Sequence, residues 1–454
     1  MTNVSRIVVS APSAGHGKTA VSVGLLAALT ARNSNASAFK LGPDYVDSAY
    51  LGMACGSVGR NLDPRMVGSA RIPELFSHGS EGTDIAVVEG AFGLFDGMTL
   101  AGDTDSTAHV ARSLRAPVIL VVDAANTGNS LAPLVHGFRT WDELTWLGGV
   151  ILTRVSSDRH EQILRDALRE VGVPVLGAYR RNDLAALPAR HHGIVPVVDR
   201  SMEALRAVRR LGEATLDRVD LDRVEAIARS APRLSETSWT PLGGAPVSQQ
   251  SPVDGPVVAV AGGSYFTYSY AENVELLQAA GATVAVVDPL RDERLPEGCQ
   301  GLLFGGGFPE RYVEELTSNV ELGRDVAKLA KSGAPIAAES SGFVWLSDEL
   351  DGRPMIAVLP AATRTNSQPV LGYRAATACS DSVLLKSGAE ITGHKNHWTT
   401  VSPRAGDTAA WNWRNGRAEG YVEGNIHASY LNLHWAAQPD IAKRFVSHIG
   451  TDAA

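Results

Sequence analysis

A short β-branched run, a glycine-rich loop and a helix-forming stretch open the chain. Residues 7–10 predict a strand, the segment Ala-Pro-Ser-Ala-Gly-His-Gly-Lys18-Thr19 follows, and residues 21–31 predict a helix. Glycines let a backbone turn tightly, so that its N–H groups surround phosphate oxygens. The strict phosphate-binding motif has Gly where this chain has Pro12 or Ser13. The segment is therefore a variant P-loop, which restricts the N-terminal part to an α/β domain.

The P-loop also predicts which residues bind nucleotide and metal. Lys18 is expected to reach the β- and γ-phosphates, and the Thr19 hydroxyl is expected to bind magnesium. The expected ATP-binding residues are Gly15, His16, Gly17, Lys18 and Thr19.

Strands and helices alternate through the first half of the chain. Such alternation implies crossover units and a mostly parallel sheet. Residues 205–228 also predict a helix, charged and packed on the outside. Residues 231–256 are rich in Pro, Ser and Gly, and a second α/β pattern follows. We predict a P-loop domain at 1–230, a linker at 231–256 and a second domain at 257–450. The other strands expected in the first half are 38–40, 85–89, 118–123, 149–153 and 175–178.

Acidic side chains recur where these strands end. The carboxyl ends of parallel strands border the crevice in which ligands bind. Magnesium prefers a few hard oxygen ligands and keeps its waters, so Thr19, Asp44 and Glu89 are its expected ligands. Lys40 is expected to neutralise charge on a transferring phosphoryl group. The segments are Lys40-Leu-Gly-Pro-Asp44-Tyr45-Val-Asp47, Asn61-Leu-Asp63 and Glu89-Gly-Ala-Phe-Gly-Leu-Phe-Asp96-Gly97.

Charge and cysteine content exclude several classes of protein. The net charge of −8 leaves no excess of Lys and Arg to neutralise nucleic-acid phosphates. The start lacks the pattern of a signal peptide, and no apolar run approaches the roughly 20 residues of a membrane helix. Cys55, Cys299 and Cys379 fit neither a disulfide framework nor a metal-ligand spacing. We expect a cytoplasmic protein with no nucleic-acid or membrane partner.

Further motifs extend over nearly the whole chain. In the first half they are Arg60-Asn-Leu-Asp63, Ile151-Leu-Thr-Arg154-Val with His160, and Leu187-Pro-Ala-Arg190-His-His-Gly193. In the second half they are Gly305-Gly-Gly-Phe-Pro-Glu310, Leu371-Gly-Tyr-Arg374, Gly393-His394 with His397, and His427-Ala-Ser-Tyr430. With the P-loop and the acidic segments, these motifs resemble the cobyrinic acid a,c-diamide synthase family, which includes the hydrogenobyrinic acid enzymes. The first domain also resembles dethiobiotin synthetase.

The resemblance implies a fold and a reaction. It implies a P-loop domain similar to dethiobiotin synthetase, followed by a class I glutamine amidotransferase-like domain, both α/β. ATP would phosphorylate the a and c carboxylates of a corrin-type tetrapyrrole in turn, and ammonia would displace phosphate to leave amides. In related enzymes the second domain releases that ammonia from glutamine. By analogy with related ligases, a homodimer is expected.

The remaining roles follow from position. Asp47, Asp63 and Asp96 line the expected crevice, where they would position substrate or incoming ammonia. Asp96 is expected to serve the chemical step, together with Asp47 and Lys40. An arginine fork pairs two carboxylate oxygens at once, so arginines near the crevice are candidates for holding substrate. The expected substrate-binding residues are Tyr45, Asp63, Arg154 and Arg190.

The glutaminase motifs depart from the family at two positions. The family's nucleophilic Cys lies in Glu-Cys-Gly-Gly, which here reads Glu-Ser340-Ser-Gly. The first His of the family's Tyr-x-His-x-His, which we take as the general base, is Asn432. A hydroxyl needs a base before it attacks, and Asn cannot accept its proton. We predict a degenerate glutaminase, with His427 or His434 as alternative bases.

The source of nitrogen and the substrate stay open. Free ammonia is expected rather than glutamine, or a separate partner glutaminase would supply it. The segment Gly393-His394-Lys-Asn-His397 also departs from the family's Gly-His-Glu-Phe-His. Two alternatives remain. One is a ligase that joins an amine to another carboxylate in specialised metabolism, and the other is a non-catalytic ATP-binding partner.

Overall fold

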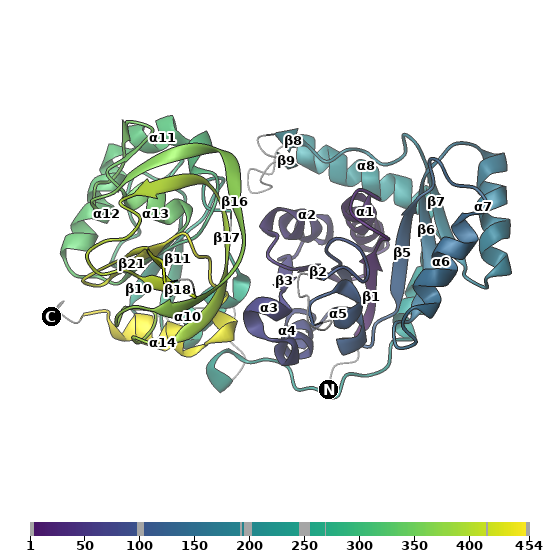
Figure 1. Ribbon diagram of the computed structural model, residues 1–454, viewed down its shortest axis with the longest axis horizontal. Helices are drawn as coiled ribbons and strands as arrows, with labels where there is room; N and C mark the ends of the chain where they lie inside the picture. The colour runs from purple at the N-terminus through teal and green to yellow at the C-terminus, as the bar shows by residue number, and fades with distance from the viewer. Residues whose placement is uncertain are drawn as a thin grey trace. The chain divides into compact units, whose positions relative to one another are not determined.

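The computed structural model describes residues 4–97, 104–190, 193–194, 202–244, 255–267, 269–414 and 416–450. The chain divides into two compact units, Met1–Trp239 and Thr240–Ala454, and each is built on its own sheet of mostly parallel strands (Figure 1). Within the described residues, no helix is both long and apolar enough to cross a membrane.

The first unit contains a seven-stranded sheet in the order β3-β2-β4-β1-β5-β6-β7. Every neighbouring pair in this sheet is parallel, as predicted. The central strands β1 and β4 are buried on both faces, which explains their continuous apolar runs. The strands are β1 Ser5–Ser10, β2 Ala36–Leu41, β3 Arg60–Leu62, β4 Ile85–Glu89, β5 Val118–Asp123, β6 Leu147–Val155 and β7 Val175–Arg180.

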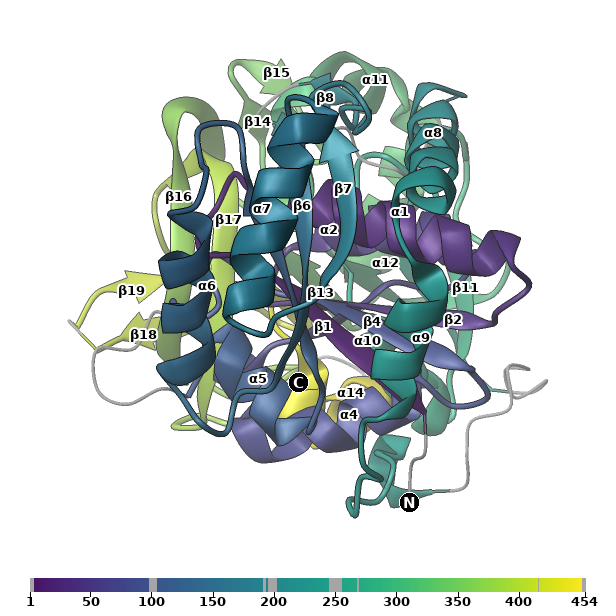
Figure 2. The same ribbon diagram turned by 90° about the vertical axis from the view of Figure 1, so that its right-hand side faces the viewer.

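Helices cover both faces of this sheet. Figure 2 shows α6 and α7 on one side of β7 and α8 and α9 on the other. One face of the sheet shares a hydrophobic core with α1, α2, α8 and α9, because alternate strand residues point to each face. The helices are α1 Lys18–Ala31, α2 Tyr45–Cys55, α3 Pro64–Val67, α4 Ile72–Gly79, α5 Thr107–Ser113, α6 Leu131–Thr140, α7 Asp158–Glu170, α8 Met202–Arg218 and α9 Leu221–Arg229.

The helical stretch expected at 205–228 is helical except at residues 219–220, where a break divides it into α8 and α9. Val219 bridges to Gly177 of β7, and the N–H of Asp220 donates to the Leu176 carbonyl at 2.8 Å. Asp220 then caps α9 by accepting from the Arg223 N–H at 3.1 Å. Pairing with the sheet edge therefore interrupts the helix. Helix α8 also packs closely on α1, since a Cβ at Gly24 would lie 2.3 Å from the Thr215 hydroxyl.

The stretch after α9 lies against the first unit. The side chain of Leu234 is buried, and the Arg6 guanidinium donates to the Pro232 carbonyl. Trp239 is also buried, and its backbone N–H donates to the Glu74 carbonyl at 3.0 Å. Residues 231–239 are thus ordered on the first unit, although composition predicted the linker to begin at residue 231. Residues 245–254 lie outside the described residues.

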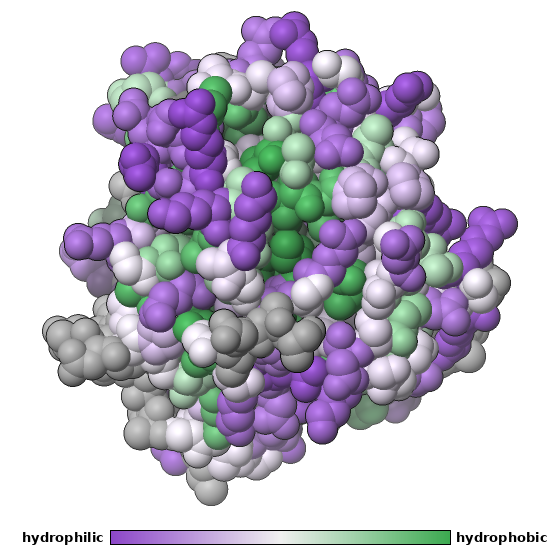
Figure 3. All heavy atoms as spheres, turned by 90° about the vertical axis from the view of Figure 1, so that its left-hand side faces the viewer, coloured by the Kyte–Doolittle hydropathy of each residue, from purple (hydrophilic) through white to green (hydrophobic). Residues whose placement is uncertain are grey.

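The second unit has a six-stranded sheet in the order β11-β10-β12-β13-β21-β20 and a second, largely antiparallel sheet. The long pair β16 (Ala362–Ala378) and β17 (Glu390–Ser402) dominates the second sheet. Figure 3 shows one face of this unit, mostly hydrophilic, with an apolar strip near its middle. The other main elements are β10 Val257–Ala261, β11 Thr283–Val287, β12 Cys299–Phe304, β13 Ile336–Glu339, β14 Glu349–Leu350, β15 Arg353–Pro354, β18 Trp411–Trp413, β19 Ala418–Glu419, β20 Tyr421–Glu423, β21 Ile426–Ser429, α10 Ala271–Ala279, α11 Val313–Ser318, α12 Val320–Lys331, α13 Ser341–Leu346 and α14 Asp440–Ser447.

Candidate functional site

The glycine-rich loop joins the carboxyl end of β1 to the first turn of α1. Gly15 and Gly17 have φ angles of +87° and +91°, a region that favours glycine. Gly17 is the N-cap residue of α1, and no side chain caps that end. The free N–H groups and the helix dipole make this end suited to an anion.

Lys18 lies in the first turn of α1, and its side chain folds back over the loop. Its ammonium donates to the Ser13 carbonyl at 3.3 Å and to the Phe92 carbonyl. Burial lowers the pKa of Lys18, as does the charge of Lys40, whereas Glu89 opposes the shift. The loop carbonyls therefore hold the ammonium beside the N–H groups that a phosphate would use.

Four predicted residues from four elements form one buried network. The Lys40 ammonium on β2 lies 2.8 Å from Glu89 Oε1 on β4 and 2.8 Å from Asp47 Oδ2 on α2. The Thr19 hydroxyl on α1 donates to Glu89 Oε1 at 2.7 Å and lies 3.4 Å from Asp47 Oδ2. The structure thus brings together a lysine, a hydroxyl and two carboxylates at the carboxyl edge of the sheet.

The electrostatics of this network balance burial against neighbouring charge. Burial opposes the charge of Lys40, but Glu89 and Asp47 outweigh it and raise the pKa of its ammonium. Burial raises the pKa of Glu89, and the nearby Lys40 opposes that shift. Lys40 therefore stays charged because of its two carboxylate partners, whereas burial outweighs Lys40 at Glu89 and leaves the pKa of that carboxyl above its ordinary value. Removing the ammonium would leave buried carboxylates without compensation, which is strongly unfavourable.

These side chains suit a magnesium ion that takes only a few ligands from the protein and the rest from phosphate and water. Glu89 is fully buried, and its Oε2 has no hydrogen-bond partner among the described residues. Thr19 adds a hydroxyl beside it. The described part of the chain holds no cluster of three or more His, Cys, Asp or Glu that could form a complete metal cage. Magnesium binds typically through one or two carboxylates, with phosphate and water oxygens as the other ligands.

Asp44 caps the N-terminus of α2, a structural role that was not predicted from the sequence. Its Oδ1 accepts from the N–H groups of Val46 at 3.0 Å and Asp47 at 2.9 Å, which caps α2. Burial raises the pKa of Asp44, and the charge of Asp47 adds to the shift. The carboxylate nearest to the Thr19 hydroxyl after Glu89 is that of Asp47. A magnesium role for Asp44 stays a prediction.

Two other predicted acidic residues also hold their local backbone. Asp63 caps α3 by accepting from the N–H groups of Arg65 at 3.0 Å and Met66 at 3.2 Å. Asp96 accepts from the Gly93 N–H at 2.9 Å. A Cβ at Gly93 would lie 2.5 Å from both Asp96 Oδ2 and the Pro12 carbonyl, so this turn packs tightly on the P-loop.

Substitution of Asp63 separates its capping role from a substrate role. We expect Asp63→Ala to lower the free energy of unfolding by about 1–2 kcal/mol, because two N–H groups lose their acceptor. Asp63→Asn keeps an acceptor and should unfold near wild type. Urea denaturation of both variants tests this expectation. Equal losses in the two variants would contradict a capping role, whereas weaker substrate binding by a stable Asp63→Asn would support the predicted substrate role.

Arg154 and His16 meet at the ends of β6 and β5. Arg154 Nε lies 2.9 Å from Asp123 Oδ1 in a paired-fork contact, and the guanidinium is more than half exposed. Burial opposes the charge of Asp123, but the bond from Arg154 lowers its pKa overall. His16 Nδ1 accepts from the Asp123 N–H at 2.8 Å. The side chain of Arg190 lies outside the described residues.

A pocket of about 350 Å³ opens beside the P-loop. Its walls come from the loop, from the end of β6 and from the segment that follows β7. Arg181 and Leu184 were not predicted, because the segment that carries them shows no periodic pattern or motif. Tyr45 begins α2 with a buried side chain and does not line this pocket. The lining residues are Gly15, His16, Gly17, Thr19, Ala20, Thr153, Arg154, Arg181, Leu184, Ala185, Ala186 and Leu187.

In the second unit, Ser340 forms a sharp turn between β13 and α13. Its backbone angles are φ +48° and ψ −100°, which are strained for a residue other than glycine. Its N–H donates to the Ser429 carbonyl at 2.7 Å. The Ser340 side chain is buried, and its hydroxyl has no partner among the described residues. The turn keeps the shape of a nucleophile elbow without a general base bonded to the serine.

Asn432 is tied to β17. Its backbone exchanges hydrogen bonds with His394 at 2.9 and 3.0 Å, and its side-chain amide donates to the His394 carbonyl at 3.0 Å. Of the alternative bases, His427 contacts the Ser382 hydroxyl at 3.1 Å, and burial lowers its pKa to about 3. His434 is buried and stacks on Tyr270. Asn432 thus serves as a structural contact in the place predicted for the base.

His394 and His397 also lie inside the second unit. Burial lowers the pKa of His394 to about 4 and that of His397 to about 3. His397 Nδ1 donates to the Thr399 carbonyl at 2.7 Å, and its ring stacks on Tyr430 with centroids 3.8 Å apart. Both are neutral core histidines near neutral pH.

The fold and the site define a P-loop nucleotide-binding domain joined to a domain of the glutamine amidotransferase type. Residues 7–194 match the CobQ/CobB/MinD/ParA nucleotide-binding domain family, and residues 257–440 match the CobB/CobQ-like glutamine amidotransferase domain family.

Curated relatives match almost the entire chain. A hydrogenobyrinate a,c-diamide synthase of Streptomyces coelicolor is 50% identical, covering 99% of this chain and 98% of that protein. One of Mycobacterium bovis is 43% identical, with 98% of each covered. A cobyrinate a,c-diamide synthase of Gloeobacter violaceus is 38% identical, with 97% and 96% covered. The chain belongs to the hydrogenobyrinate and cobyrinate a,c-diamide synthase family, as its motifs predicted.

Proposed function

We propose that this protein amidates the a and c carboxylates of hydrogenobyrinic or cobyrinic acid, using ATP and magnesium to form acyl phosphates. The observation that carries the proposal is the buried network of Thr19, Lys40, Asp47 and Glu89 beside the P-loop. The proposal assigns the ligase chemistry to residues 1–230, with 231–239 packed on that unit, and treats 257–450 as a degenerate glutaminase domain.

The P-loop would hold the phosphates of ATP through its N–H groups. Lys18 would exchange its two loop carbonyls for phosphate oxygens, which requires only a change of side-chain conformation. The pocket of about 350 Å³ beside the loop offers space for the nucleoside, with Thr153, Arg154 and Arg181 on its wall.

Thr19 and Glu89 would hold magnesium, with Asp47 or Asp44 as a further ligand. Magnesium supplies charge neutralisation across the β- and γ-phosphates when it is bound. Lys40 lies beside the same carboxylates and would neutralise charge on the phosphoryl group as it moves. Each of these groups is held by the fold before substrate binds, so little reorganisation accompanies the reaction.

The overall reaction has two steps at each carboxylate. A carboxylate oxygen takes the γ-phosphoryl group from ATP, which leaves ADP and an acyl phosphate. Ammonia then attacks the carbonyl carbon, phosphate leaves with the bonding electrons, and the nitrogen loses a proton to give the amide. Asp96, near the P-loop turn, would position ammonia for this attack.

Free ammonia is the nitrogen donor in this proposal. Ser340 has no base bonded to its hydroxyl, and Asn432 is tied to His394. A serine without a base is a weak nucleophile, so glutamine hydrolysis in this unit should be slow. A separate glutaminase that delivers ammonia fits the same observation.

Turnover in the presence of each nitrogen donor tests the proposal. Phosphate release and the mass of the macrocycle would be followed with ATP, magnesium, and hydrogenobyrinic or cobyrinic acid. We expect two successive amidations with an ammonium salt, little product with glutamine, and no product after magnesium is chelated. Product from glutamine at the ammonium rate would contradict the degenerate glutaminase. No turnover with either donor would indicate another carboxylate substrate.

A further inference from the structure

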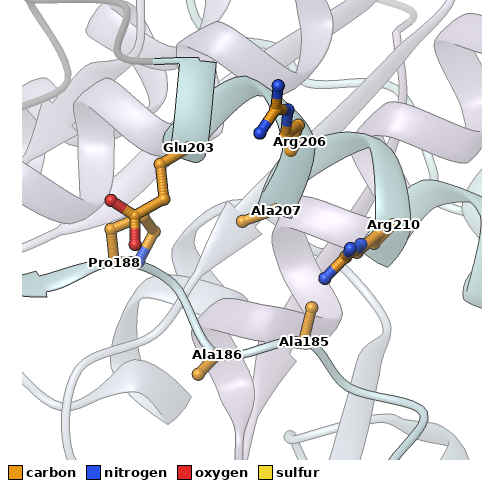
Figure 4. A pocket seen from close by; sticks show the side chains of 7 residues that line it. All are labelled: Ala185, Ala186, Pro188, Glu203, Arg206, Ala207 and Arg210. Carbon is orange, nitrogen blue, oxygen red and sulfur yellow. The ribbon is translucent and has the colours of Figure 1, made fainter.

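A second pocket, of about 310 Å³, lies next to the P-loop pocket (Figure 4). The two pockets share Ala185 and Ala186, so a short piece of chain separates them. The second pocket has a wall from the segment after β7 and a wall from α8. Its lining residues are Ala185, Ala186, Pro188, Glu203, Arg206, Ala207 and Arg210.

Helix α8 places charge at the rim and small side chains at the floor. Ala207 is buried at the edge of the stripe that packs on α1, while Arg206 and Arg210 are exposed one turn apart. Figure 4 shows Arg210 extending over Ala185 and Glu203 extending over Pro188. The alanines are too small to fill the space between the helix and the segment, which leaves a hollow open to a ligand.

The pocket lining carries two arginines and one acidic residue, Glu203, so it has a net positive charge. Arg206 and Arg210 form no ion pair or hydrogen bond with any described residue. Like charges four residues apart on a helix repel each other, so the arrangement is unfavourable by itself. The neighbouring arginines of α8 are paired instead, Arg209 with Glu213 at 2.8 Å and Arg218 with Asp183 at 2.9 Å. Two guanidinium groups without a direct salt bridge to a described residue, placed over an apolar floor, suit an oxyanion.

We propose that this pocket binds a carboxylate arm of the tetrapyrrole and so selects which peripheral carboxylate reaches the P-loop. This inference rests on the proposed function. The phosphates of ATP already have their site at the P-loop, on the other side of Ala185 and Ala186. Glu203 offsets one of the two arginine charges, so the pocket matches a singly charged carboxylate better than a doubly charged phosphate.

The test compares a double variant with a matched control on the same helix. Arg206→Gln/Arg210→Gln removes both rim charges, and Arg209→Gln removes an exposed arginine outside the pocket lining. Hydrogenobyrinic acid, cobyrinic acid and ATP would each be titrated calorimetrically into full-length protein. We expect the double variant to bind the macrocycle on the order of 10-fold more weakly or worse, with unchanged ATP affinity and a smaller salt dependence. Arg209→Gln should bind each ligand as wild type does.

The outcomes separate this inference from the proposed function. Equal macrocycle binding by wild type and the double variant would overturn the inference and leave the proposed function standing. An equal loss in Arg209→Gln, or a loss of ATP affinity in the double variant, would also overturn it. A wild-type protein that binds neither hydrogenobyrinic nor cobyrinic acid would overturn both. All three substituted side chains are exposed, and thermal unfolding would verify that the variants fold.

Discussion

Replacing Lys40 by methionine is expected to slow amidation by about 10²–10³-fold and to destabilise the first unit by about 3–5 kcal/mol. The rate falls because the phosphoryl group loses a positioned cation. The stability falls because Glu89 and Asp47 keep their buried carboxylates without the ammonium 2.8 Å away. Urea denaturation and macrocycle mass, each measured on full-length Lys40→Met, would quantify the two effects.

A double variant separates the two losses. Lys40→Met/Glu89→Gln removes one of the two buried carboxylates left without a partner, so its stability should recover part of the deficit while its activity stays low. The loss in Lys40→Met should also depend on pH. A buried carboxyl with a raised pKa is tolerated while it is protonated, so the deficit should grow as the pH rises above about 4.3, the ordinary pKa of Glu. A stability deficit that shrinks with rising pH, or activity restored in the double variant, would contradict both roles assigned to Lys40.

Restoring a thiol and an imidazole in the second unit is expected to create glutamine-dependent amidation. Ser340→Cys/Asn432→His should release glutamate from glutamine at least about 10²-fold faster than wild type. A thiol is partly thiolate near neutral pH, and the new imidazole can accept its proton. The elbow already holds residue 340 in the strained conformation, so the backbone needs no change. Glutamate release and macrocycle mass would be measured together.

Two further variants serve as controls for this gain. Ser340→Cys alone lacks the base, and Ser340→Ala/Asn432→His lacks a nucleophile, so both should stay near background. The substitution removes the hydrogen bond from the Asn432 side-chain amide to the His394 carbonyl, but an imidazole N–H can make the same bond. Glutamine-dependent amidation by the wild-type protein would show that the hydroxyl of Ser340 works without the predicted base. No gain in the double variant would show that the second unit has lost more than these two groups.

Local sequence patterns predicted the parallel sheet of the first unit well. Its central strands are buried on both faces, so their sequences are continuous apolar runs. A segment that faces solvent would carry polar residues instead, so these runs identify buried strands. The P-loop was equally clear, because Gly15 and Gly17 occupy backbone conformations that few other residues adopt. The break at residues 219–220 between α8 and α9 was not predicted, because pairing of Val219 with β7 is a long-range contact that helix periodicity does not record.

Single site residues were harder to assign than the site itself. Asp44 and Asp47 are both acidic, lie three positions apart and follow the same strand, so the sequence did not separate them. In the structure Asp44 caps α2, while Asp47 contacts both Thr19 and Lys40. Arg181, Arg206 and Arg210 carried no motif at all, because they meet their pockets only through the packing of α8 and the segment after β7.

By itself the sequence determined the family, the two-domain α/β organisation and the chemistry of the P-loop. These three features depend on the type of residue at a fixed spacing along one strand, loop or helix. Such spacing can be read from the sequence directly. Only the tertiary structure decided which carboxylate faces Thr19 and that α8 ends at Arg218. It also placed Arg206 and Arg210 of α8 over a pocket, with no salt bridge to another described residue. Those features depend on which distant segments pack together, and packing is a property of the whole core rather than of any one segment.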